Sequence, residues 1–294
     1  MKDNHFNQLL LLLLATLFIS SSGALGKFID MPVPVIIWMR SIIASVLLYG
    51  FCRYKKYRLA LRTRKDLILF IISGLFLATH WITYFYALKL SNVAIGMLSL
   101  FVYPILTALI EPLFIDTKFD PIYIVLGVMV LFGIYILAPE FNLESAHVKG
   151  ALFGLLSALF YSIRNIISKQ MVSRYNSTSI MFYQITIISV VLLPVLWLQD
   201  SSNIETQYPY IIILGVITTA VGHTMLVNSL KHFTVSTASI ISSVQPILGI
   251  IIAFIFLREI PTWNTFFGGT VILLTVVIES LRSQKKNKAL FKSK

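Results

Sequence analysis

The sequence predicts an all-α integral membrane protein with ten transmembrane helices, arranged as two inverted five-helix repeats. Three observations lead to this fold. The chain is 57% hydrophobic and only 12% charged, whereas about a quarter of the residues in a soluble domain are charged. Apolar segments long enough to cross a bilayer, roughly 20 residues each, recur along its whole length. The first half of the chain also matches the second half at a fixed offset.

Ten apolar segments follow one another with short connections that leave no room for a soluble domain. Within lipid, the backbone polar groups of each segment must be satisfied by the protein itself, so we expect these segments to be helices. The predicted spans cover residues 8–26, 32–52, 67–88, 93–115, 121–138, 150–170, 179–198, 208–230, 234–257 and 261–281.

The internal repeat rests on residue types that are uncommon by chance in so apolar a chain. At an offset of 142 residues, the matched pairs are Pro104 with Pro246, Gly127 with Gly269, and Lys89 with Lys231. Residues 5–27 match residues 147–169, so we expect the first segment to be a retained helix rather than a cleaved signal peptide. The predicted repeats are residues 1–138 and 147–282, followed by a basic tail at 283–294. Because five is an odd number, the second repeat enters the membrane from the opposite side.

The basic residues predict the orientation of the chain. With the N-terminus inside, 18 of the 24 Lys and Arg residues fall on the cytoplasmic side and four on the outer side. This is a strong positive-inside bias, and it predicts a multi-pass protein of the bacterial inner (plasma) membrane with both termini cytoplasmic. The net charge of +12 is therefore explained by topology and anionic lipid headgroups, without a nucleic-acid partner.

Several classes of function lack their sequence features. Cys52 is the single cysteine, so neither an internal disulfide nor a cysteine metal cluster is expected. No Gly-rich loop ends in Gly-Lys-Ser/Thr, so the chain has no recognisable ATPase of its own. With no clustered catalytic set, we predict no enzyme activity, no catalytic residue, no cofactor and no metal site.

Arg40 is the residue least suited to lipid. It lies about 12 Å into the second span at ~1.5 Å per residue, where an arginine costs roughly 2.5–3.5 kcal/mol. Either it fixes helix packing by bonding to carbonyl groups, or it contacts substrate or a gate. Gln184 occupies the equivalent position in the second repeat, which suggests that the two residues face one central cavity. We expect Arg164, nearer a membrane surface, to extend its charge to the interface.

The histidines His80 and His223 occupy nearly equivalent positions in the two repeats. Since histidine titrates near neutral pH, this pair could relay protons or line the two gates; each could equally be a packed, satisfied side chain. Trp81, Tyr84 and Tyr103 lie deep enough that their polar atoms need partners, which favours a pocket lining. The other candidate cavity residues are Tyr161, Asn165 and Gln245.

Two prolines, Pro104 and Pro246, fall near the middle of the fourth and ninth spans. A proline inside a helix frees a carbonyl group and bends the helix. Matching prolines in the two repeats therefore predict paired kinks, which serve as hinges, shape a cavity or only allow packing.

The segment 242–278 (SSVQPILGIIIAFIFLREIPTWNTFFGGTVILLTVVI) resembles the helix 9–10 signature of the EamA family in the drug/metabolite transporter superfamily. In that signature a mid-helix proline is followed by a Glu about 13 residues later and then by a Gly that opens helix 10. Here these residues are Pro246, Glu259 and Gly268 or Gly269. In the first repeat, Thr117 stands where the Glu would be.

The resemblance implies ten helices around a central cavity and transport, often export, of amino acids or similar metabolites. We therefore predict a transporter that exports such compounds by alternating access. Arg40 favours a substrate with a carboxylate or phosphate, so sugar-phosphate or nucleotide-sugar transport is an alternative. Multidrug export of lipophilic compounds is another, although a carrier of cations would be expected to hold a carboxylate near the membrane centre. The expected partners are the lipid bilayer, a small-molecule substrate and protons as a candidate coupling ion, and the protein would be a monomer or homodimer.

Overall fold

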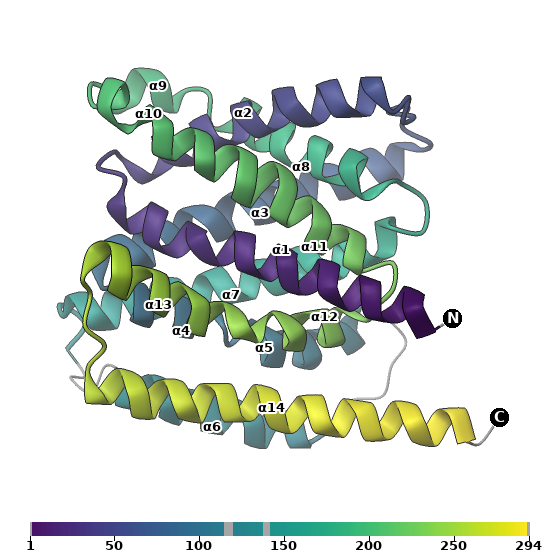
Figure 1. The fold of residues 1–294 in the computed structure, drawn as a ribbon, viewed down its shortest axis with the longest axis vertical. Helices are drawn as coiled ribbons and strands as arrows, with labels where there is room; N and C mark the ends of the chain where they lie inside the picture. Colours follow the sequence, from purple (N-terminus) through teal and green to yellow (C-terminus); the bar gives the residue numbers. More distant parts are fainter. Residues whose placement is uncertain (1, 115–119, 138–141, 293–294) are drawn as a thin grey trace.

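The computed structural model describes residues 2–114, 120–137 and 142–292, and these residues form helices and loops with no strand among them. The helices lie side by side as one bundle (Figure 1). Thr117 and the side chains of the 283–294 tail lie outside the described residues.

The first half contains three long helices followed by a broken one. The helices are α1 (Lys2–Phe28), α2 (Val33–Tyr54), α3 (Arg64–Leu90), α4 (Val93–Leu100), α5 (Tyr103–Ile110), the 3-10 turn η1 (Glu111–Leu113) and α6 (Ile122–Leu137). Side-chain caps define two of the helix starts. Thr63 accepts a hydrogen bond from the backbone N–H of Asp66 at the start of α3, and Asn92 accepts one from Ile95 at the start of α4.

The second half has the same order with more interruptions. It consists of α7 (Ala146–Met171), α8 (Ser177–Val191), α9 (Val195–Leu198), α10 (Ile204–Ile213), the π-helical segment η2 (Leu214–His223), α11 (Thr224–Ser229), α12 (Val235–Ile241), the 3-10 turn η3 (Ser242–Val244), α13 (Gln245–Leu257) and α14 (Trp263–Lys292).

Eight helical segments in the described part of the chain are long and apolar enough to cross a membrane. They coincide with eight of the predicted spans. At the fifth and tenth positions the apolar helices are shorter, Ile122–Leu137 and Trp263–Ile278. The 16 residues of α6 extend about 24 Å at ~1.5 Å per residue, less than a hydrocarbon core of ~30 Å. The count of ten transmembrane helices therefore stays a prediction.

The helices α6 and α14 pack along each other at one edge of the bundle (Figure 1). Gly133 and Gly268 face each other where they cross. A Cβ atom on Gly268 would lie 2.7 Å from the carbonyl oxygen of Gly133. The absence of side chains at both positions lets the backbones approach closely, as is common between helices in membranes.

Two lysines 142 residues apart make equivalent contacts at the ends of α1 and α7. The Lys27 ammonium donates to the carbonyl oxygens of Lys89 (3.2 Å) and Ser91 (2.7 Å). The Lys169 ammonium donates to the carbonyl oxygens of Leu230 (2.6 Å) and Phe233 (2.9 Å). Each lysine thus joins the end of the first helix of its half to the end of the third, where free carbonyl groups favour a cation.

The contacts of Ser91 indicate that α1 and α7 run in opposite directions. Ser91 lies beside Lys27 at the end of α1, and it also lies against Gly150 near the beginning of α7, where a Cβ atom would collide with it. The end of one helix and the beginning of its counterpart are therefore at the same face of the bundle. The start of α1 and the end of α14 lie together at the opposite face (Figure 1).

Both prolines singled out in the sequence stand just after an interruption of a helix. Pro104 lies in the first turn of α5, after α4 has ended at Leu100, and Pro246 lies in the first turn of α13, after η3. The first turn suits proline because its missing N–H would have no helical partner there. The regular helix is therefore interrupted just before each proline, within spans that run over Val93–Leu113 and Thr237–Leu257. A kink at each proline stays a prediction.

Equivalent loops of the two halves should lie on opposite sides of the membrane if the repeats are inverted. Arg58 and Ser202 are exposed residues in the second loop of each half. In a Cys52→Ser background, we expect a membrane-impermeant maleimide to label Ser202→Cys in intact cells, and Arg58→Cys only after the membrane is opened. Labelling of both positions from one side would contradict inversion.

Candidate functional site

A small closed cavity lies at the centre of the bundle, where the two halves meet. Its volume is about 20 Å³, which leaves room for only a water molecule or so. The lining residues are Ile19, Ser22, His80, Trp81, Tyr84, Leu100, Phe101, Tyr161, His223 and Gln245. Leu100, Phe101 and Gln245 come from the two helix interruptions. Sites bordered by broken helices at a repeat interface are typical of transporters.

Six of the candidate residues chosen from the sequence line this cavity: His80, Trp81, Tyr84, Tyr161, His223 and Gln245. The other four, Arg40, Tyr103, Asn165 and Gln184, lie behind it. The structure therefore separates the candidates into a lining set and a supporting set.

His80 is held firmly by one serine and one aromatic ring. Its Nδ1 is 2.7 Å from Ser157 Oγ, and Ser157 Oγ donates to the His80 carbonyl oxygen at 2.9 Å. Since the serine proton is used in that second bond, Nδ1 carries the imidazole proton and donates it to Ser157, which leaves Nε2 as an acceptor. The ring also stacks on Tyr161, with centroids 4.3 Å apart.

His223 is buried, with 2% of its surface exposed, and its Nδ1 has no hydrogen-bond partner. Its ring packs against Trp81, with centroids 5.3 Å apart. It stands at the end of the π-helical segment η2, and such segments are often found at functional sites. Buried polar atoms are normally paired, so His223 offers an unused hydrogen-bonding atom to a molecule in the cavity.

Arg40 is separated from the cavity by Trp81. Its Nε donates to Thr219 Oγ1 at 2.8 Å and its Nη2 to Thr218 Oγ1 at 3.0 Å. The guanidinium lies 4.2 Å from the centroid of the Trp81 ring, within the range of a cation–π contact. The Phe85 ring centroid lies 5.5 Å from the same guanidinium. The described partners of this buried charge are thus two hydroxyl groups and two aromatic rings.

Arg164 is fully buried, so the expectation that it reaches the membrane surface was wrong. Gln184 Oε1 accepts hydrogen bonds from its Nε (3.1 Å) and its Nη2 (2.6 Å), and Asn165 Oδ1 accepts one from its Nη1 (2.9 Å). These amide oxygens satisfy the guanidinium inside the bundle. The amide of Gln184 in turn donates to Ser73 and Ser168. Gln184 therefore pairs with Arg164, while Arg40 makes its hydrogen bonds to the two threonines.

Two tyrosines connect the supporting residues to the cavity. The Tyr161 hydroxyl is hydrogen-bonded to Asn165, so the cavity lining is attached to the Arg164 cluster. Tyr103 packs its ring edge-on to Tyr161 at 4.8 Å, and its hydroxyl donates to the Ser239 carbonyl oxygen at 3.4 Å. This last bond joins the interruption of the first half to the broken helix of the second half.

The electrostatic character of the site follows from these positions. Arg40 and Arg164 are buried cations one layer behind the cavity, and none of the described residues that line it is acidic. The buried carboxylate Asp66 lies elsewhere, where Arg174 approaches it to 2.5 Å. In a medium of low dielectric constant, uncompensated cations act strongly on a nearby charge. The described lining thus places two buried positive charges behind the cavity and no carboxylate beside it.

Sequence reasoning missed the hydroxyl groups that support the site, namely Ser157, Thr218 and Thr219. Serine and threonine are frequent between membrane helices as interhelical hydrogen-bonding residues. No signal in the sequence distinguished these three from the many others.

The sequence matches the EamA-like transporter family twice, over residues 7–138 and 148–281. It is similar to the pseudopaline exporter CntI of Pseudomonas aeruginosa, with 25% identity over 273 residues that cover 91% of this chain and 94% of that protein. The S-adenosylmethionine uptake transporter of Rickettsia bellii is 30% identical over 126 residues, covering 41% of this chain and 43% of that protein.

A protein of known crystal structure shares the fold, with a TM-score of 0.69 and 18% sequence identity. The superposition covers 95% of this chain and 98% of that one. The named relatives are transporters rather than enzymes.

The Arg164 cluster predicts a large effect of one substitution on stability. Gln184→Leu removes two hydrogen bonds to a buried guanidinium, each of a kind worth about 1.5–3 kcal/mol. We expect the free energy of unfolding in detergent to fall by about 2 kcal/mol or more, measured by chemical denaturation. Gln184→Glu keeps the acceptor oxygens and should lose less. Equal stability of Gln184→Leu and the unsubstituted protein would show that the bonds to Gln184 contribute little to stability.

Proposed function

This chain belongs to the EamA-like transporter family and is a multi-pass membrane transporter, and we propose that it exports amino acids or related small metabolites by alternating access. The observation that carries the proposal is the central cavity itself. It is bordered by both helix interruptions, lined by aromatic rings and two imidazoles, and backed by two buried guanidinium groups.

The lining supports a substrate with an anionic group and an apolar body. Arg40 and Arg164 favour a carboxylate or a phosphate, and the rings of Trp81, Tyr84 and Tyr161 favour contact with carbon. Amino acids combine both features. Sugar phosphates and nucleotide sugars share the anionic group and are the second candidate class. A lipophilic cation is disfavoured, because the described lining offers it no carboxylate.

The closed cavity supports an occluded conformer of the alternating-access cycle. With a volume of about 20 Å³, it is far smaller than the ~300 Å³ or more of ordinary ligand sites, so the helices around it must separate before a substrate enters. We infer that the interruptions at 101–102 and 242–244 are the places where this movement occurs. Opposite directions of α1 and α7 support two related half-movements, one toward each face.

Export is the direction that the comparisons favour. One relative that matches nearly the whole chain, CntI, is named as an exporter, whereas the S-adenosylmethionine uptake transporter of Rickettsia bellii matches less than half of it. Relatives of this chain occur in the bacteria Pseudomonas aeruginosa and Bacillus subtilis and in the archaeon Archaeoglobus fulgidus. This supports the location of the protein in a prokaryotic cell membrane. The positive-inside bias supports a cytoplasmic location of both termini.

Substrate selection should depend on the carboxylate. In proteoliposomes preloaded with an unlabelled amino acid mixture, we expect counterflow of labelled amino acids with apolar side chains. Amines of the same carbon skeleton that lack the carboxylate should give at least about tenfold less, since one lost charge-assisted contact is worth about 1.5–3 kcal/mol. Sugar phosphates and tetraphenylphosphonium complete the panel, and protein-free liposomes are the control. Preference for the amines or for the lipophilic cation would overturn the anion-favouring assignment.

Coupling to protons, if it occurs, should depend on His223 more than on His80. His80 already donates to Ser157, whereas Nδ1 of His223 is unpartnered. We expect an imposed pH gradient to accelerate flux in the unsubstituted protein and in His80→Gln, but not in His223→Gln. Gradient-driven flux that persists in the double substitution excludes both histidines as carriers. Indifference of the unsubstituted protein to the gradient would identify a uniporter or exchanger.

A further inference from the structure

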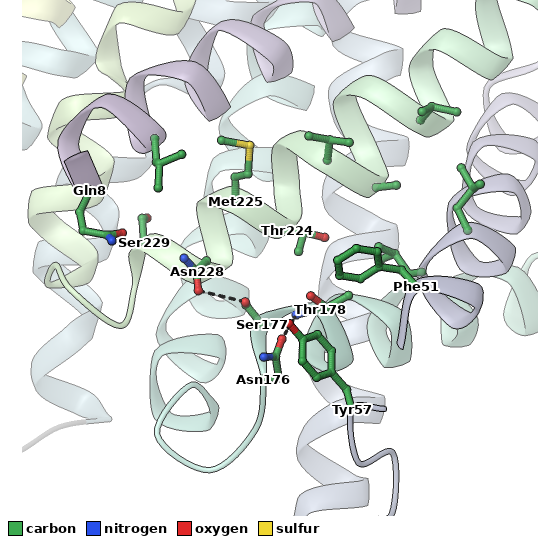
Figure 2. A pocket seen from close by; sticks show the side chains of 16 residues that line it. Gln8, Phe51, Tyr57, Asn176, Ser177, Thr178, Thr224, Met225, Asn228 and Ser229 are labelled. Atoms are coloured by element: carbon green, nitrogen blue, oxygen red, sulfur yellow. Dashed lines mark hydrogen bonds between the residues drawn. The ribbon is translucent and has the colours of Figure 1, made fainter. Parts of the chain in front are cut away.

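A second cavity, of about 550 Å³, lies between α1, α2, α8, η2 and α11 (Figure 2). We call it the α2–α11 groove. It is much larger than the central cavity, and the two share none of their described lining residues. Its size is that of an ordinary ligand site, roughly 300–1,000 Å³.

The walls of the groove are apolar and open toward the membrane. Leu47 and Phe51 on α2 are each 44% exposed, and Val221 on η2 is 37% exposed. All three lie within helices that are long and apolar enough to span the bilayer. Their exposed surface therefore faces hydrocarbon, and an occupant that enters between them must itself be apolar along its length.

One end of the groove is polar without being charged. Tyr57, Asn176 and Asn228 gather there with Ser177, whose hydroxyl donates to Asn228 Oδ1 at 3.2 Å (Figure 2). None of the described residues that line the groove carries a charge. This end thus provides hydrogen-bonding groups suited to the ester and glycerol region of a lipid.

Exposed cations stand close in the sequence to residues at the polar end. Lys55 and Arg58 lie on either side of Tyr57 in the chain, and Lys231 follows the lining residue Ser229 closely. Basic residues at the boundary of a membrane helix attract anionic headgroups. Along the groove, an apolar wall is followed by neutral polar groups and then by basic residues. This order matches the acyl chain, the ester region and the phosphate of an anionic phospholipid.

We propose that the α2–α11 groove binds one anionic phospholipid. An acyl chain lies along Leu47, Phe51 and Val221, and the phosphate is held by Lys55, Arg58 and Lys231. This site is independent of the transport cavity, and it gives the protein a preference among the lipids of its membrane.

The test is the affinity of delipidated protein in detergent for two lipids with identical acyl chains, phosphatidylglycerol and phosphatidylcholine, followed by native mass spectrometry. We expect phosphatidylglycerol to bind at least about fivefold more tightly, the effect of one or more surface cations. Lys55→Gln combined with Arg58→Gln should remove most of this preference and leave phosphatidylcholine binding unchanged. Arg64→Gln combined with Lys65→Gln, at the start of α3, is the matched control and should keep the preference.

A groove-filling variant tests the acyl-chain site separately. Ala220 is a buried wall residue, and Ala220→Trp should weaken both lipids by about tenfold. Should that variant not fold, the exposed charge pair decides alone. Equal affinity of the unsubstituted protein for the two lipids, or an unchanged preference in the charge variant, would overturn the proposal. So would displacement of the lipid by a transported substrate, because the groove would then belong to the transport path.

Discussion

The burial of two guanidinium groups in the middle of a membrane protein is the constraint on which the rest of this structure depends. Neither Arg40 nor Arg164 can reach water, and each is satisfied by neutral groups: two threonine hydroxyls for one, and the amide oxygens of Gln184 and Asn165 for the other. Neutral partners supply hydrogen bonds without cancelling charge. The centre of the bundle therefore keeps a positive potential, which is the physical basis of the anionic substrate proposed here.

The helix ends and the helix centres differ in how regularly they are bonded. At the ends, Lys27 and Lys169 join the first and third helices of each half through carbonyl oxygens. Near the centre, the α4–α5 and α12–α13 interruptions break the regular backbone bonding beside the cavity. This arrangement is the basis for the proposal that the helices move at the interruptions beside the cavity.

Composition was sufficient to predict an all-helical membrane architecture, and six of the candidate residues chosen from the sequence lie around the central cavity. Depth in the membrane identified His80, Trp81 and His223, because polar groups so far from water need a common polar environment. The same reasoning failed for Arg164. Its burial depends on Gln184, on a neighbouring helix, and depth alone does not reveal such a partner. The sequence also does not predict that Thr218 and Thr219 lie in a π-helical segment, in which both hydroxyl groups accept hydrogen bonds from Arg40. The apolar segment 121–138 predicted a membrane span, and α6 covers Ile122–Leu137 of it.

The differences between the two repeats carry more functional information than their similarity. Arg40 and Gln184 hold equivalent positions in the two repeats. Arg40 carries a charge, whereas Gln184 is neutral and accepts hydrogen bonds from another charged residue, Arg164. His80 and His223 are nearly equivalent in sequence. Nδ1 of His80 is hydrogen-bonded to Ser157, whereas Nδ1 of His223 has no hydrogen-bond partner. A perfectly symmetric pair of halves would present the same groups to both faces. Because the symmetry is broken at these positions, the two halves present different groups to the cavity. The imidazole nitrogen without a partner, Nδ1 of His223, comes from the second half.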